Sequence, residues 1–150
     1  MTPTDKTIYK ICREQAGYTQ ERAAELLPCS VRQLARYEAG EVPVPDDMAY
    51  RMVILYNSQY LAVQHLRTVS QLAASIIPAV DSVSLQTAAM RLFNVVMDFA
   101  EKHPDRQLLR IAEDGLISEE ERPVLEDILQ ELRVLSKVCY EVQAATEREV

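Results

Sequence analysis

The chain has 150 residues, 48% of them apolar and 26% charged, and a formal net charge of −7. This length can bury a core and leaves room for one domain or two small ones, and no apolar run approaches the roughly 18 residues of a membrane span. Three glycines, few aromatic residues and many good helix formers favour helix nearly everywhere, so the sequence predicts an all-α fold.

The composition also bounds the chemistry and the compartment. Residues 1–6 lack the basic start and apolar block of a signal peptide, so we expect a soluble, cytoplasmic protein. Cys12, Cys29 and Cys139 lie far apart and form no C-x-x-C pair, which predicts reduced, mostly buried thiols rather than zinc ligands or a disulfide. With no phosphate-binding glycine loop and no nucleophile motif, we expect no enzyme activity, no cofactor and no metal site.

The charge is divided unevenly between the two halves. Residues 1–67 carry eight Lys/Arg and eight Asp/Glu, whereas residues 68–150 carry eight and fifteen. A neutral first part followed by an acidic second part argues against nonspecific binding to nucleic acid along the whole chain.

Three short helices are predicted in the first forty residues. The first covers about 5–15, with Ile8, Ile11, Cys12 and Gln15 on one face. A second helix runs from a cap at Thr19 to Pro28, which stops it. A third is capped by Ser30, ends near residue 38 and is followed by Gly40, which suits a left-handed C-cap. Two short helices therefore meet across a tight turn.

The next segment is an extended connector followed by helix. Prolines at 43 and 45 push their preceding residues out of the helical region. Asp46 or Asp47 is the predicted cap of the following helix. From 48 to 70 the apolar spacing predicts one long helix, or two in series with a break at Asn57–Ser58.

The second half is predicted to be helical as well. One helix follows the caps at 81–84 and stops at His103–Pro104, and a shorter one covers about 105–113 and ends at Gly115. Ser118 and Glu121 have capping-box spacing and start a last helix that runs to about Thr146. The apolar stripe of the first of these helices consists of Leu85, Ala89, Leu92, Val96 and Phe99.

The last helix carries a heptad-like seam that Val124, Leu129 and Val138 widen. The seam consists of Leu125, Ile128, Leu132, Leu135, Cys139 and Val142. A wide stripe favours the core face of a bundle over a bare two-stranded coiled coil, and both hold if the bundle itself dimerises.

The segment GYTQERAAELLPCSVRQLARYEAG, residues 17–40, resembles the phage repressor and Cro (Xre-type) helix-turn-helix family. The resemblance covers about residues 4–57, roughly the first third of the chain. It implies two crossed helices whose second member enters the major groove of double-stranded DNA.

The resemblance also implies a role for individual residues. The outward face of the third helix is the expected reading face, where arginine can grip guanine and glutamine can grip adenine. Gln20 is expected to hold a phosphate, while Arg13 and Glu38 are expected to pair and clamp the recognition helix. The reading face consists of Ser30, Val31, Arg32, Gln33 and Arg36.

Two residues depart from the pattern of that family. Pro28 stands where the family often has glycine, which predicts a slightly different turn with φ near −65°. Glu41 stands where relatives often have a basic residue, which together with Glu38 dilutes the positive field and predicts modest affinity for DNA unless two copies bind.

These observations predict three regions: a helix-turn-helix DNA-binding domain at 4–57, a linking helix at 58–80, and a helical oligomerisation or partner-binding domain at 81–147. The expected function is a sequence-specific transcription regulator of bacterial or phage type that acts as a homodimer on a palindromic operator. The alternative is a protein-interaction adaptor that keeps the fold but binds another regulator instead of DNA.

Overall fold

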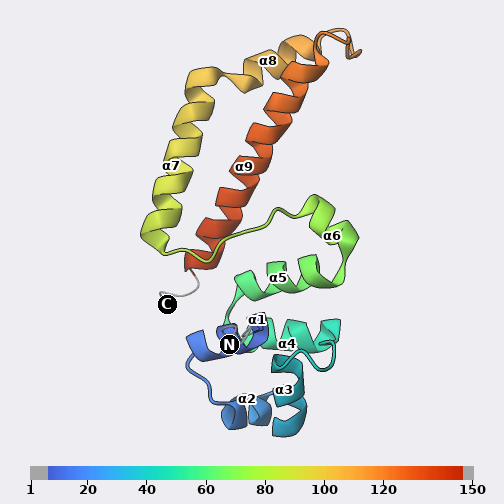
Figure 1. The fold of residues 1–150 in the computed structure, drawn as a ribbon. Coiled ribbons are helices and arrows are strands. Elements are labelled where there is room, and N and C mark those ends of the chain that lie inside the picture. Colours follow the sequence, from blue (N-terminus) through green and yellow to red (C-terminus); the bar gives the residue numbers. More distant parts are fainter. Residues whose placement is uncertain (1–6, 147–150) are drawn as a thin grey trace, which may run out of the picture. The chain divides into compact units, whose positions relative to one another are not determined.

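The computed structural model describes residues 7–146, and these are helical without a strand (Figure 1). The prediction of an all-α fold is therefore confirmed. The described residues divide into two compact units, one that ends at Ala79 and one that covers Val80–Thr146. Within residues 7–146, no helix combines the length and the apolar character needed to cross a bilayer.

The first unit begins with the predicted short helices. Thr19 and Ser30 cap as expected, because their hydroxyls accept hydrogen bonds from the backbone N–H groups of Arg22 and Gln33, both at 3.1 Å. The helices of this unit are α1 Ile8–Gln15, α2 Gln20–Leu26, α3 Val31–Glu38, α4 Asp46–Tyr56, α5 Gln59–Val69 and α6 Gln71–Ile76.

Two helix starts differ from the prediction. α1 begins at Ile8, with Thr7 as its N-cap, and the predicted start at Asp5 lies outside the described residues. The N-cap of α4 is Pro45, so neither Asp46 nor Asp47 caps this helix. Both aspartates lie in its first turn instead, where a negative charge is stabilised by the positive end of the helix dipole.

The turn between α2 and α3 uses no left-handed residue. Leu27 is extended, with φ −100° and ψ 150°, and the only positive-φ residues before Asn57 in the described chain are Gly17 and Gly40. This bears out the expectation that Pro28 requires a turn different from one with glycine. Leu27 itself is 4% exposed and closes the core.

The predicted break at Asn57–Ser58 is present, but the segment after it does not form one linking helix. Asn57 adopts the left-handed conformation with φ 48°, and the Ser58 hydroxyl caps α5 through the N–H of Leu61 at 3.2 Å. Leu61 is fully buried and α5 packs against α1 and α4, so α5 belongs to the first unit. Ser70 ends α5 and caps α6. The prediction of a linking helix was wrong because the apolar face of α5 is buried against α1 and α4. Sequence spacing shows that such a face exists, but it does not show which helices cover it.

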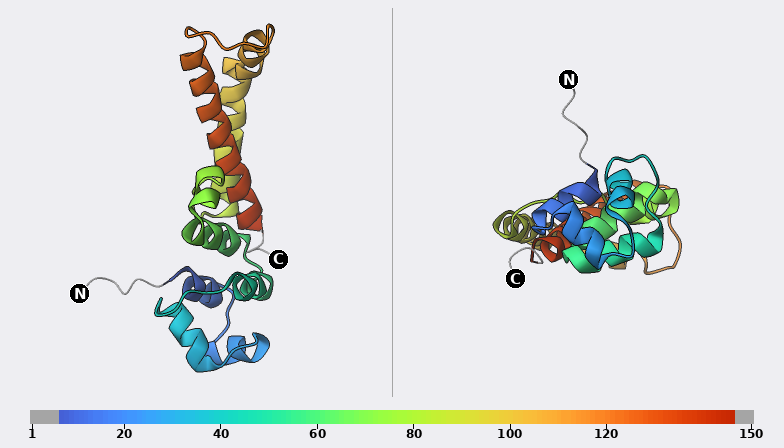
Figure 2. Two further views of the ribbon diagram at one scale, coloured as in Figure 1. Left: turned by 90° about the vertical axis from the view of Figure 1, so that its right-hand side faces the viewer. Right: turned by 90° about the horizontal axis from the view of Figure 1, so that it is seen from below.

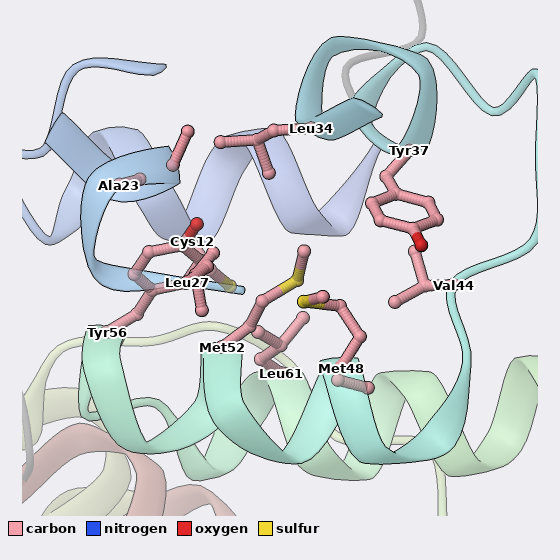
Figure 3. Packing of buried hydrophobic residues seen from close by; sticks show 12 residues of the cluster. Cys12, Ala23, Leu27, Leu34, Tyr37, Val44, Met48, Met52, Tyr56 and Leu61 are labelled. Carbon is pink, nitrogen blue, oxygen red and sulfur yellow. The ribbon is translucent and has the colours of Figure 1, made fainter. Parts of the chain in front are cut away.

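The core of the first unit lies among α1 to α5. Figure 3 shows Met48 and Met52 reaching from α4 toward Leu34 and Tyr37 on α3. Flexible, unbranched methionines fill irregular space between helices that cross at different angles. The core therefore holds α3 against the rest of the unit. Its buried members are Cys12, Ala23, Ala24, Leu27, Leu34, Tyr37, Val44, Met48, Ala49, Met52, Tyr56 and Leu61.

The second unit is a helical hairpin. α7 Leu85–Lys102 and α9 Arg122–Thr146 lie side by side, and α8 Pro104–Ile111 connects them (Figures 1 and 2). The predicted capping box before α9 is present: the Glu121 N–H donates to the Ser118 hydroxyl at 3.3 Å, and the Ser118 N–H donates to the Glu121 carboxylate at 2.8 Å.

Charged groups fasten one end of this hairpin. Arg91 of α7 donates to both carboxylate oxygens of the buried Glu141 of α9, at 3.0 and 3.2 Å. Lys137 reaches Asp81 at 3.0 Å, and this hydrogen bond lowers the pKa of Asp81. The cluster fixes the start of the unit, just before α7, beside the last turns of α9.

Candidate nucleic-acid interface

Small residues let α2 and α3 approach each other closely. Ala23 is fully buried and Ala24 is 6% exposed, both on the face of α2 that carries Leu27 into the core. On α3, Leu34 and Tyr37 are the buried counterparts. Burying this side of α3 leaves its opposite side facing outward, as the sequence predicted.

The outward side of α3 carries the predicted reading residues. Ser30, Val31, Arg32 and Arg36 are exposed, and Gln33 is half-buried. The Ser30 hydroxyl is occupied as the cap of α3. Arg32 forms no ion pair within residues 7–146, so its guanidinium is available to a ligand.

Arg36 differs from Arg32 because it has a partner. Its Nε lies 3.4 Å from Oε2 of Glu41, and both side chains are exposed. Glu41 is the acidic residue that stands where relatives often have a basic one. Its carboxylate here offsets the charge of one of the two arginines on the reading face. An exposed ion pair contributes little stability, so a ligand can displace it at small cost.

A buried ion pair anchors α3 to α1. Arg13 donates from Nε and Nη2 to the two carboxylate oxygens of Glu38, at 2.6 and 3.1 Å. Nη1 donates to the carbonyl of Tyr18 at 2.6 Å. The hydrogen bond to Glu38 raises the pKa of Arg13, so the guanidinium stays charged. The pairing implied by the family resemblance is present, and it clamps the end of α3.

Gln20 takes part in the same network. Its Nε2 donates to Oε2 of Glu38 at 2.8 Å, so the side chain points at the buried pair. Sequence reasoning placed Gln20 at a phosphate and missed this contact, because a partner eighteen residues away has no local signal. An amide nitrogen carries two hydrogens, and the bond to Glu38 uses one of them.

The structure adds a second buried polar contact that the sequence did not indicate. His65 is 3% exposed, and its Nδ1 lies 2.7 Å from the hydroxyl of Tyr9. Its Nε2 lies 3.4 Å from a carboxylate oxygen of Asp46. The hydrogen bond with Tyr9 joins α5 to α1, whereas Nε2 makes no hydrogen bond within the described residues.

Comparison with known proteins supports this interpretation of the first unit. Residues 10–57 match the family model of a helix-turn-helix domain, which confirms the predicted helix-turn-helix in this part of the chain. No curated protein and no solved structure matched the chain. The match covers α2, α3 and α4 together with most of α1, the elements that build and support the outward face of α3.

Proposed function

We propose that the chain is a sequence-specific DNA-binding regulator of transcription, of bacterial or phage type, that acts in the cytoplasm by binding and not by catalysis. The observation that carries the proposal is the exposed face of α3 on a domain of the helix-turn-helix family, where Arg32 forms no ion pair with any described residue. The buried pair of Arg13 and Glu38 supports it, because base readout requires a recognition helix held in one orientation.

In this proposal α3 lies in the major groove. Arg32 and Arg36 offer two donors each to guanine O6 and N7, and Gln33 offers a donor and an acceptor to adenine. Val31, which is 40% exposed, suits the methyl group of thymine. The free hydrogen on the amide of Gln20 remains available to a phosphate, which positions the domain without reading sequence.

The protein is further proposed to act as a homodimer on a palindromic operator. One recognition helix reads too few base pairs to be selective, and a symmetric dimer presents two such helices about 34 Å apart, one turn of B-DNA. The neutral charge of residues 1–67 supports this arrangement, because a single domain neutralises few phosphates.

Selection of the full chain against random duplexes, followed by titration of the selected duplex at fixed salt, tests the proposal. Arg32→Ala and Arg36→Ala should each cost about 1–3 kcal/mol of binding free energy and relax the preference at one base pair. Arg106→Ala removes the same charge from an exposed position in the second unit and should leave binding unchanged. If no duplex is enriched, the DNA-binding function fails and the adaptor function is favoured. If a duplex is selected but Arg32→Ala binds it as tightly as the wild type, the reading face is wrong.

A further inference from the structure

The hairpin of the second unit leaves one broad apolar side uncovered. Four apolar side chains of α7 are between 47% and 62% exposed: Met90, Phe93, Val96 and Met97. Their spacing of three and four residues places them along one side of the helix. On α9, Leu129 is 42% exposed and Cys139 is exposed, next to the half-buried Leu125 and Leu132. We call these residues the open face.

The two rows lie on the same side of the hairpin. Leu85, Leu92 and Phe99 of α7 form its seam toward α9, and the open row is turned by roughly a third of a helical circumference from that seam. On α9 the seam contains Ile128 and Leu135, and the open row is turned in the same sense. Because the helices are antiparallel, equal turns bring both rows to one side.

The apolar stripes predicted from the sequence only partly match the buried sides of these helices. Ala89 and Val96 of the predicted α7 stripe are in fact exposed, and so is Cys139 of the predicted α9 seam. Each helix therefore has an apolar arc too wide for one partner helix. An arc of that width is typical of a helix with two packed neighbours.

The hairpin alone has a small core. Three of the seven buried apolar side chains among the described residues of this unit are alanines, which bury little area. An isolated pair of helices stabilises itself through such a seam only weakly, because most helix stability comes from tertiary packing. The described core residues of this unit are Val80, Ala88, Ile111, Ile128, Val138, Ala144 and Ala145.

We propose that the open face is covered by the same face of a second copy of the chain, so that two hairpins form a four-helix bundle. The two-fold axis runs along the bundle, and α7 of each protomer lies against α9 of the other. This rests on the homodimer of the proposed function and assigns its interface to specific residues.

The charges at the edges of the open face favour a second copy. Glu101 follows Met97 by four residues and Arg133 follows Leu129 by four, so each lies at the outer edge of the face. Neither forms an ion pair within the described chain. Glu101 and Arg133 therefore offer opposite charges on the two edges, which a self-complementary interface can pair.

The register within the hairpin brings these two charges to the same level. Lys102 Nζ lies 3.6 Å from Oε1 of Glu131, so residues near 101 stand level with residues near 132. In a dimer with its axis along the bundle, Glu101 then stands beside Arg133 of the partner subunit. Such flanking pairs select the partner and the orientation of helix bundles.

The area of the open face is also large enough for a stable dimer. α7 is about 27 Å long and two adjacent helices are about 20 Å wide. A corrugated surface of these dimensions is of the order of the roughly 800 Å² that each partner of a stable complex buries.

Sedimentation equilibrium of the full chain at tens of micromolar tests this interface. The wild type should be a dimer, and Phe93→Glu should raise the dimer dissociation constant by at least tenfold. Gln130→Glu introduces the same charge on the side of α9 that is turned away from the open face, and it should leave the dimer intact. Helical circular dichroism confirms that each variant is folded, and Phe93→Ala with Met97→Ala provides a milder pair if the glutamate variant unfolds.

A charge exchange tests the register. Glu101→Arg should weaken the dimer several-fold because like charges then face each other, and adding Arg133→Glu should restore it. A monomeric wild type overturns the proposal. If the wild type and Phe93→Glu are both dimers, the open face is excluded while the homodimer stands. If Phe93→Glu is monomeric but no duplex is bound, the interface stands and the DNA-binding function fails.

Discussion

At the scale of single residues, Tyr56 stands apart in the core of the first unit. Its side chain is buried against Tyr18, with ring centroids 6.1 Å apart, and its hydroxyl has no hydrogen-bond partner within the described residues. Burial, followed by the charge of Glu38, raises the pKa of Tyr56. A buried hydroxyl without a partner costs about 1–3 kcal/mol of desolvation.

Tyr56→Phe should therefore leave the free energy of unfolding at neutral pH unchanged or raise it. Because the folded pKa of Tyr56 is raised, its protonated form stabilises the fold below the unfolded pKa near 10, and this contribution is lost as the pH rises above that value. Urea unfolding across pH 7 to 11 should show a shallower alkaline loss in the variant. Tyr50→Phe, at an exposed position, is the control, and a large loss of stability at pH 7 in Tyr56→Phe would contradict the assignment.

At the scale of elements, the turn between α2 and α3 depends on a residue with restricted φ. Pro28→Gly should destabilise the first unit by about 0.4–1 kcal/mol, because no left-handed conformation is used there and glycine only adds freedom to the unfolded chain. Thermal unfolding measures the difference. Equal or greater stability of the glycine variant would show that Pro28 is strained.

The elements themselves were largely predictable because their signals are local. The caps Thr19, Ser30 and Ser118 act within three residues of their own position, so sequence spacing suffices to find them. The division of segment 58–80 into α5 and α6 was not predictable from local signals. Whether α5 continues as a linker or packs into a core depends on the buried Leu61 and on which helices meet it.

In the candidate site, too, the features with local signals were predictable and the long-range contacts were not. Burial of Leu34 and Tyr37 follows from helical periodicity, and it exposes the reading face of α3. The contacts of Gln20 with Glu38 and of Tyr9 with His65 join residues 18 and 56 positions apart. Only the folded chain brings such pairs together.

At the scale of the whole molecule, the division at Ala79 predicts an independent first unit. A fragment of residues 1–79 should fold, stay monomeric and bind the selected duplex much more weakly than the full chain, since linking two copies raises effective concentration without new contacts. The fragment should include α6, because Arg67 of α5 donates hydrogen bonds to the carbonyls of Ala74 and Ile77 and so holds α6 to the first unit. Chemical unfolding and sedimentation of the fragment provide the measurement. An unfolded or dimeric fragment would place essential contacts elsewhere.

The ion pair of Arg36 and Glu41 affects how the copies of a DNA-binding protein are distributed between specific and nonspecific sites in a genome. Every stretch of duplex competes for the protein through its phosphates, and a bacterial chromosome offers about 10⁶ such competitors. The carboxylate of Glu41 adds a negative charge beside Arg36, so we expect the domain to hold random sequence less tightly than one without it. If the chain acts on an operator as proposed, fewer copies would then be sequestered on random sequence, and fewer molecules per cell would suffice to occupy the operator.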